Sequence, residues 1–157
     1  MQINGQKIGG RYVARVCCKL MSASLTKKEY HSLASLRHLL RKFLRFSKDL
    51  ASDRASLTPE QYEALLALKA FSADDGLTVG QLSEYVQVKH HTAVTLTDKL
   101  AARKLLTKRR GDKDRRYVYL NLTSAGARVV TNLATAHRRE LRKHAAEMIK
   151  SLSNLKK

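Results

Sequence analysis

Residues 109–123 read RRGDKDRRYVYLNLT, a dense run of charge around Gly111 that gives way to alternating apolar and polar residues. Alternation with a period of two is typical of a β-strand, whose successive side chains point to opposite faces. One face would carry Arg116, Val118, Leu120 and Leu122, and the other Arg115, Tyr117, Tyr119 and Asn121. We therefore predict a hairpin with strands over 105–110 and 115–122 and a turn at 111–113.

The residues before this hairpin predict two short helices separated by a tight turn. The first, over 78–86, begins with Thr78 in the N-cap position and Gln81 in the capping-box position. The second runs from about residue 89 or 90 to about 104, with Ala93, Leu96 and Leu100 on its apolar face. This pattern is typical of a helix-turn-helix, and a hairpin that follows it is a wing.

The polar face of the second short helix would enter the major groove of DNA. The residues predicted to contact DNA from this helix are Lys89, His90, His91, Thr92, Thr95 and Lys99. For the two histidines, the alternative is that they are exposed side chains with no function.

Net charge supports a polyanionic partner. The 157 residues contain 31 Lys and Arg against 13 Asp and Glu, a net charge of +18. The charge is also unevenly placed. Residues 58–88 carry one lysine against five carboxylates, whereas residues 89–116 carry ten Lys and Arg against three Asp. Nucleic acid is favoured over an anionic membrane, since no stretch approaches the roughly 18 apolar residues of a spanning helix; lysines scattered for solubility are the alternative.

The wing itself would supply much of this positive charge. We predict that five of its cations contact phosphate or enter the minor groove: Lys108, Arg109, Arg110, Lys113 and Arg115. Asp114 and Arg116 share a face two residues apart, and we predict that they pair and stiffen the hairpin.

Two longer helices are predicted on either side of this region. Over 29–50, leucines and phenylalanines recur at spacings of three and four, and a further apolar stripe follows over 124–155. A third helix begins at the sequence SLTPEQ, with Thr58 as N-cap and Gln61 in the capping box. Its predicted buried side is formed by Leu65, Leu66, Leu68 and Phe71. The two long helices carry more apolar surface than a winged domain of this size can cover alone, which predicts a homodimer.

The first residues carry no assigned function. Residues 1–24 are basic, and we expect a disordered leader, although an organellar transit peptide has the same composition and Met21 could be the natural start. Cys17 and Cys18 are adjacent, and no Cys/His spacing suits zinc, so we expect no metal, no cofactor and a reducing cytoplasm. A redox-sensing thiol is the alternative. No carboxylate pair, nucleophile motif or phosphate loop has a recognisable spacing, so we predict no enzyme activity.

Over about residues 29–152 the order of these features resembles the MarR family of transcriptional regulators. The most specific match is Asp114-Arg115-Arg116, similar to the family's D-x-R wing, followed by residues 122–126, similar to its L-T-x-x-G sequence. Supporting matches are Leu57-Thr58, Leu82, Thr92 and Asp98-Lys99-Leu100. The chain departs from the family at Lys89, where a serine-type N-cap is usual, at His90-His91, and at Lys104, where glycine is common.

The resemblance implies a mainly α winged helix-turn-helix fold with a two-stranded β-wing and N- and C-terminal dimerisation helices. We assign 25–157 to one domain, 57–123 to its winged lobe, and 29–50 and 124–155 to dimerisation. The resemblance further implies a homodimer that binds a palindromic operator on double-stranded DNA, and a repressor relieved by a small phenolic or carboxylate ligand. From residue type alone, Tyr30, His31, Arg37 and Tyr62 are candidate ligand contacts. The rival hypothesis is sequence-independent architectural nucleic-acid binding.

Overall fold

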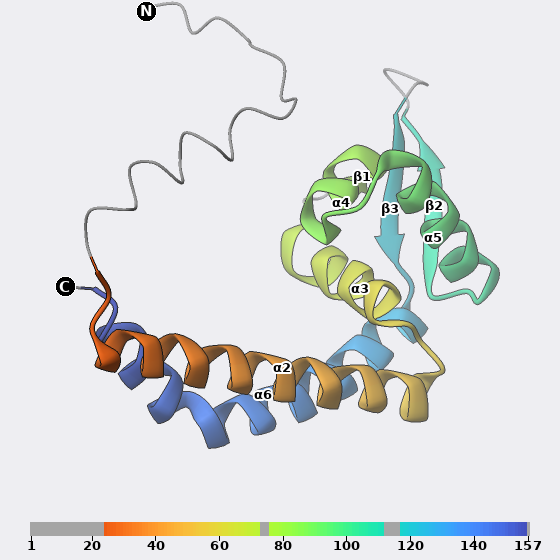
Figure 1. Ribbon diagram of the computed structural model, residues 1–157. Helices are drawn as coiled ribbons and strands as arrows, with labels where there is room; N and C mark the ends of the chain where they lie inside the picture. The colour runs from red at the N-terminus through yellow and green to blue at the C-terminus, as the bar shows by residue number, and fades with distance from the viewer. Residues whose placement is uncertain (1–23, 73–75, 112–116, 157) are drawn as a thin grey trace, which may run out of the picture.

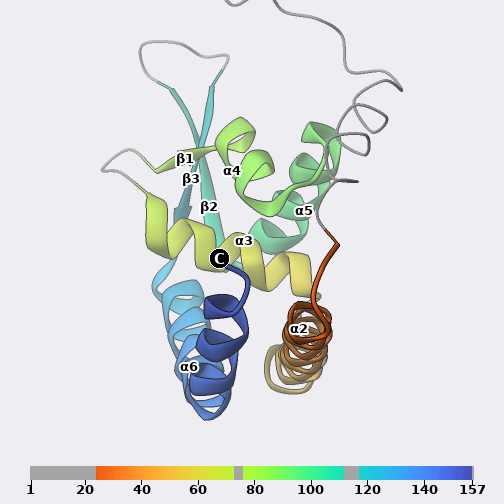
Figure 2. The same cartoon turned by 60° about the vertical axis from the view of Figure 1, so that its left-hand side comes forward.

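The computed structural model describes residues 24–72, 76–111 and 117–156, which form two long helices and a compact lobe (Figure 1). Helices α2 (Lys27–Ala55) and α6 (Ser124–Ser153) lie side by side in opposite directions. Figure 2 looks nearly along both helices and shows helix α3 (Pro59–Phe71) crossing above them. The residues between α3 and α6 therefore form a lobe on one side of the helix pair.

Both long helices begin at threonine caps. Thr26 forms a capping box with Glu29, whose Oε2 accepts from the Thr26 backbone N–H at 2.7 Å. Thr123 Oγ1 accepts from the Gly126 N–H at 3.0 Å at the start of α6. Helix α2 continues one turn past the predicted residue 50, to Ala55, and Ser56 ends it in a left-handed conformation with φ of 50°. The domain limits expected from the sequence, 25–157 for the whole domain and 57–123 for its winged lobe, stay predictions.

The lobe contains the predicted helix-turn-helix. Capping boxes at Thr58–Gln61 and Thr78–Gln81 start α3 and α4 (Val79–Val86), which confirms both predicted helix starts. Helix α5 (His90–Ala102) follows after a turn in which Gln87 is left-handed. The largest fully buried side chains of the lobe include Leu65, Leu68, Leu82, Leu100, Leu106 and Leu120. Since burying each leucine contributes about 1.5–3 kcal/mol, this cluster is what fixes α5 against the other helices.

Two side chains predicted on the buried side of α3 are exposed. Leu66 is 38% exposed because it lies on the flank of α3 next to α6, where it lines a groove of about 270 Å³. Phe71 is 54% exposed at the last position of the helix, where its ring stacks on Tyr85 of α4 with centroids 4.4 Å apart. The prediction was wrong for both, whereas Leu65 and Leu68 are buried as expected.

The wing belongs to a three-stranded antiparallel sheet of order β1-β3-β2. Strands β2 (Leu106–Arg110) and β3 (Val118–Leu122) form the predicted hairpin, with Lys108 opposite Leu120. The third strand, β1 (Leu77–Thr78), pairs with Leu120 and Tyr119 and was not predicted, because two residues are too few to show a period. Leu120 is fully buried and holds the hairpin to the lobe.

Several predicted features lie outside the described residues. These are the leader up to residue 23, including Cys17 and Cys18, and the wing residues Lys113, Asp114, Arg115 and Arg116. Among the described helices, none combines the length and apolar character needed to cross a membrane.

Candidate nucleic-acid interface

Helix α5 presents a polar face and buries an apolar one, as predicted. Ala93, Leu96 and Leu100 are buried against the lobe. All six residues predicted to contact DNA are exposed at the start and along the outer side of the helix: Lys89, His90, His91, Thr92, Thr95 and Lys99. Because the apolar face is anchored in the core, the polar face is held rigidly outward.

The first turn of α5 is not capped by a side chain. Lys89 occupies the N-cap position with extended backbone, φ −66° and ψ 150°, and makes no side-chain cap hydrogen bond. The first N–H groups of a helix have no partner within the helix, and the helix dipole makes this end attractive to anions. With Lys89 and two histidines around it, this helix start suits a phosphate group of a duplex.

The wing places further cations beside this helix. The Arg109 guanidinium lies 5.7 Å from the centre of the Tyr119 ring on the neighbouring strand. Arg110 is exposed at the end of β2. The Gly111 N–H donates to the Tyr117 carbonyl at 2.9 Å and keeps the two strands paired at this point.

Lys108 makes a contact that the sequence did not predict. Its ammonium lies 2.6 Å from Asp98 Oδ1 of α5, and the Lys108 side chain is 25% exposed against 62% for Asp98. The predicted phosphate contact of Lys108 therefore has a competitor within the protein. The pair ties the wing strand β2 to α5, which would be the recognition helix in a DNA groove, so it can fix the position of the wing relative to that groove.

The four candidate ligand residues do not gather in the structure. Tyr30, His31 and Arg37 are exposed on the first turns of α2, and Tyr30 is 61% exposed. Tyr62 of α3 is 4% exposed and stacks on the His137 ring. The same ring contacts residues 43–47 of α2, so Tyr62 lies near that part of the helix. Tyr30 is at least 13 residues from that point, which is roughly 20 Å along a helix. These residues cannot bind one small molecule together.

Tyr62 instead belongs to a buried junction of three helices around His137 of α6. The two rings stack with centroids 4.6 Å apart, and Phe43 and Phe46 of α2 meet the imidazole edge-on. The imidazole Nδ1 donates to the Leu133 carbonyl at 2.7 Å, so Nε2 accepts from the Ser47 hydroxyl at 2.8 Å when the ring is neutral. Burial lowers the pKa of His137 from the usual 6.5, partly offset by the Leu133 carbonyl, which raises it.

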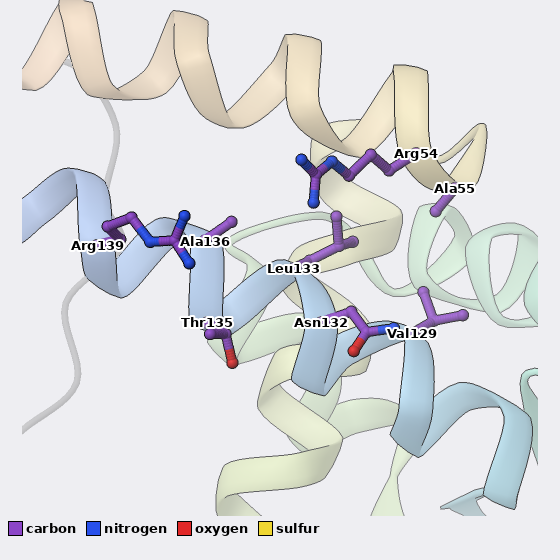
Figure 3. Close-up of a pocket in the computed structure, with 8 residues that line it drawn as sticks. All are labelled: Arg54, Ala55, Val129, Asn132, Leu133, Thr135, Ala136 and Arg139. Carbon is purple, nitrogen blue, oxygen red and sulfur yellow. The ribbon is translucent and has the colours of Figure 1, made fainter.

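A groove between α2 and α6 was also missed by sequence reasoning (Figure 3). Its volume is about 490 Å³, and Arg54 and Arg139 extend toward the space between the helices. Its other lining residues are Ala55, Val129, Asn132, Leu133, Thr135 and Ala136. Two guanidinium groups next to apolar surface suit a small organic anion. No local pattern links positions 54 and 139, so the sequence held no signal for this groove.

The geometry of the lobe agrees with comparisons to known proteins. The sequence model of the MarR family matches residues 55–116, from the end of α2 past β2 and ending before β3. Over these residues the chain is similar to the MarR family, and its winged helix fold is the one that solved MarR family structures have. No curated protein matches it.

Three solved structures show how far the likeness extends across this chain. AbsC, a MarR family transcriptional regulator from Streptomyces coelicolor, has a TM-score of 0.67 and 18% identity, and the match covers 85% of this chain and 90% of AbsC. MepR of Staphylococcus aureus, solved as a DNA complex, has a TM-score of 0.62 and 20% identity, and the match covers 79% of this chain and 85% of MepR. The PcaV transcriptional regulator of Streptomyces coelicolor, solved with its natural ligand, has a TM-score of 0.55 and 29% identity, and the match covers 69% of this chain and 77% of PcaV.

One departure from the MarR family pattern has a clear structural outcome. Lys104 stands where glycine is common in the family, and it takes the left-handed conformation with φ of 57°. A non-glycine residue in this region costs of order 1 kcal/mol and persists where neighbouring contacts hold the backbone. The recognition helix of this chain therefore ends with the same type of turn that glycine would allow.

Proposed function

We propose that this protein is a DNA-binding transcriptional regulator of the MarR family that acts in the cytoplasm on a palindromic operator. The observation that carries the proposal is the exposed polar face of α5, with the cations of β2 at its side. A helix of this shape enters the major groove, while a wing follows the backbone or the minor groove. The DNA complex of the similar MepR is consistent with this use of the fold.

In this proposal, the residues of α5 and the wing have separate tasks. Lys89 and the wing cations, among them Arg109 and Arg110, bind phosphates and supply affinity that depends on salt. His91, Thr92 and Thr95 lie where base edges are read, through hydrogen bonds and contact with thymine methyl groups. The Thr95 hydroxyl donates to the His91 carbonyl at 3.1 Å, so its oxygen remains oriented to accept from a base amine.

The long helices support a homodimer. Large apolar side chains are exposed along both of them: Leu33, Leu40 and Leu44 of α2, and Leu141, Ile149 and Leu152 of α6. Large apolar side chains exposed along two neighbouring helices are costly in water, which favours their burial in an interface. Pairing α2 and α6 with those of a second copy would place two recognition helices in successive major grooves, with half-site centres about 34 Å apart.

We further propose that the protein is a repressor that a small aromatic acid releases from DNA. Arg54 and Arg139 would pair with the carboxylate, and Val129, Leu133 and Ala136 would contact the ring. PcaV, solved with its natural ligand, offers a precedent among the similar structures. This groove replaces Tyr30, His31, Arg37 and Tyr62 as the proposed ligand site.

A second candidate function is sequence-independent architectural binding, which the net charge of +18 favours. Selection of bound sequences from a pool of random duplexes separates the two. A regulator enriches one palindrome whose half-sites are about one helical turn apart. A pool that shows no enrichment, while the protein retains DNA at low salt, would contradict the proposed regulator and support the architectural function.

A further inference from the structure

The turn that follows the recognition helix is attached to the ends of both long helices. Arg103 is the C-cap of α5, and its guanidinium donates to two successive carbonyls at the end of α2. The Nη1 atom lies 2.8 Å from the Ser56 oxygen, and Nη2 lies 2.6 Å from the Ala55 oxygen. The last carbonyls of a helix receive no hydrogen bond from within the helix and carry partial negative charge. A guanidinium group, with two parallel N–H donors and a positive charge, therefore binds them well.

The next two residues of the turn are held by α6. Thr123, the N-cap of α6, donates from its hydroxyl to the Lys104 carbonyl at 2.8 Å and from its backbone N–H to the Leu105 carbonyl at 3.2 Å. Gly126 packs so closely on Leu105 that a Cβ there would lie 1.9 Å from the Leu105 oxygen. Residues 103–105 thus form a joint between α5, the end of α2 and the start of α6.

We propose that Arg103 is a positioning residue that sets the angle of the recognition helix to the dimerisation helices, and thereby the half-site spacing that the dimer accepts. The inference rests on the proposed function. In a symmetric dimer, α2 and α6 fix the twofold axis, so the angle between these helices and α5 determines the separation of the two recognition helices. The α6 side of the joint is made by the Thr123 hydroxyl, the Thr123 N–H and a tight glycine contact, whereas the α2 side depends on the Arg103 side chain.

One base pair inserted between half-sites moves them apart by about 3.4 Å and rotates one against the other by roughly 35°. A rigid joint cannot follow this change, so the duplex itself must deform. A joint that has lost its bond to α2 allows each lobe to adjust. Loss of Arg103 should therefore relax the dependence on spacing without removing contacts between α5 and each half-site.

The experiment measures affinity for the palindrome selected from random duplexes and for versions with one or two base pairs added to or removed from its centre. The variants are Arg103→Lys, which keeps the charge but loses the two parallel donors, and Arg103→Ala. Arg45→Ala, at an exposed position of α2 away from the joint, controls for the loss of one charge. A duplex with a single half-site reports the contacts of α5 alone.

We expect the unaltered protein and Arg45→Ala to lose about tenfold or more in affinity per base-pair change, and both Arg103 variants to lose less than about threefold. Single half-site affinity of Arg103→Lys should stay within about twofold of the unaltered protein. A spacing profile for Arg103→Lys as sharp as that of the unaltered protein would overturn the inference and leave the proposed function standing. If the unaltered protein itself shows no preferred spacing, the proposed function fails, and this inference fails with it.

Discussion

Replacement of Gly126 by alanine tests the packing of α6 on the lobe. An added Cβ would lie 1.9 Å from the Leu105 oxygen, 2.9 Å from the Leu105 carbonyl carbon and 3.2 Å from Leu122 Cδ2. Real Cβ atoms do not approach within 3.0 Å of such atoms, so the Leu105 backbone would have to move by roughly 1 Å. That movement would also stretch the bond from the Thr123 N–H to the Leu105 carbonyl, which is already 3.2 Å.

The expected size of the effect follows from three contributions. Overpacking against backbone costs about 1–3 kcal/mol, and weakening of one backbone hydrogen bond costs about 1 kcal/mol. The better helix propensity of alanine offsets less than about 1 kcal/mol of this. We expect Gly126→Ala to lower the free energy of unfolding by about 2–3 kcal/mol, which corresponds to a fall in melting temperature of roughly 5–10 °C.

Gly80→Ala is the matched control, because Gly80 also lies in the first turn of a helix, α4, and its added Cβ would meet nothing closer than Thr78 Oγ1 at 3.9 Å. Its stability should stay level or rise by up to about 1 kcal/mol. Both variants are compared by urea unfolding at one protein concentration, because dimerisation makes stability depend on concentration. Equal stability of Gly126→Ala and Gly80→Ala would refute the close contact between α6 and the joint.

Four further predictions concern charge, pH and the groove. Asp98→Asn should weaken operator binding by about two- to fivefold, because the pair with Lys108 positions the wing. The free energy of unfolding should change by less than about 1 kcal/mol, since the pair is exposed. Tighter operator binding would mean that net charge dominates. Burial lowers the folded-state pKa of His137 below 6.5, so its contribution to stability is present above that pH and is lost as pH falls through the lower folded-state pKa. Unfolding free energy should therefore fall less from about pH 7 to pH 5 in His137→Phe than in the unaltered protein, and parallel curves would contradict this. Arg110→Ala should weaken binding to operator and scrambled duplex alike and reduce the salt slope by about 1; an unchanged slope would place Arg110 away from phosphate. Benzoate or 4-hydroxybenzoate should raise the melting temperature of the unaltered protein and of Arg138→Met but not of Arg139→Met; no shift in any of the three would exclude the groove as their site.

Local patterns in the sequence predicted the elements that rest on local chemistry. The capping pairs Thr58–Gln61 and Thr78–Gln81 act over three residues, so their helix starts could be read directly. The buried and exposed faces of α5 were likewise predicted, because its apolar residues repeat with the helical period. Leu120 lies on the predicted face with Val118 and Leu122, and it is the fully buried central residue of β3.

Contacts between distant residues could not be predicted in this way. Arg103 binds carbonyls 47 and 48 residues earlier in the chain, and no sequence period connects them. Leu66 and Phe71 show the related limit: periodicity identifies apolar positions, but neighbouring elements decide which of them are covered. The candidate ligand residues Tyr30 and Tyr62 lie far apart for the same reason. Tyr30 is on the first turn of α2, whereas Tyr62 lies near the part of α2 that holds Phe43 and Phe46.

The central claim is that this protein reads a DNA sequence. The most direct test is its affinity for the selected palindrome and for a scrambled duplex of equal length and composition, measured at two salt concentrations including the physiological one. We predict that the palindrome binds about 10³-fold or more tightly at physiological salt. Equal affinity for the two duplexes, with the same steep dependence on salt, would contradict the claim and leave charge alone as the basis of binding.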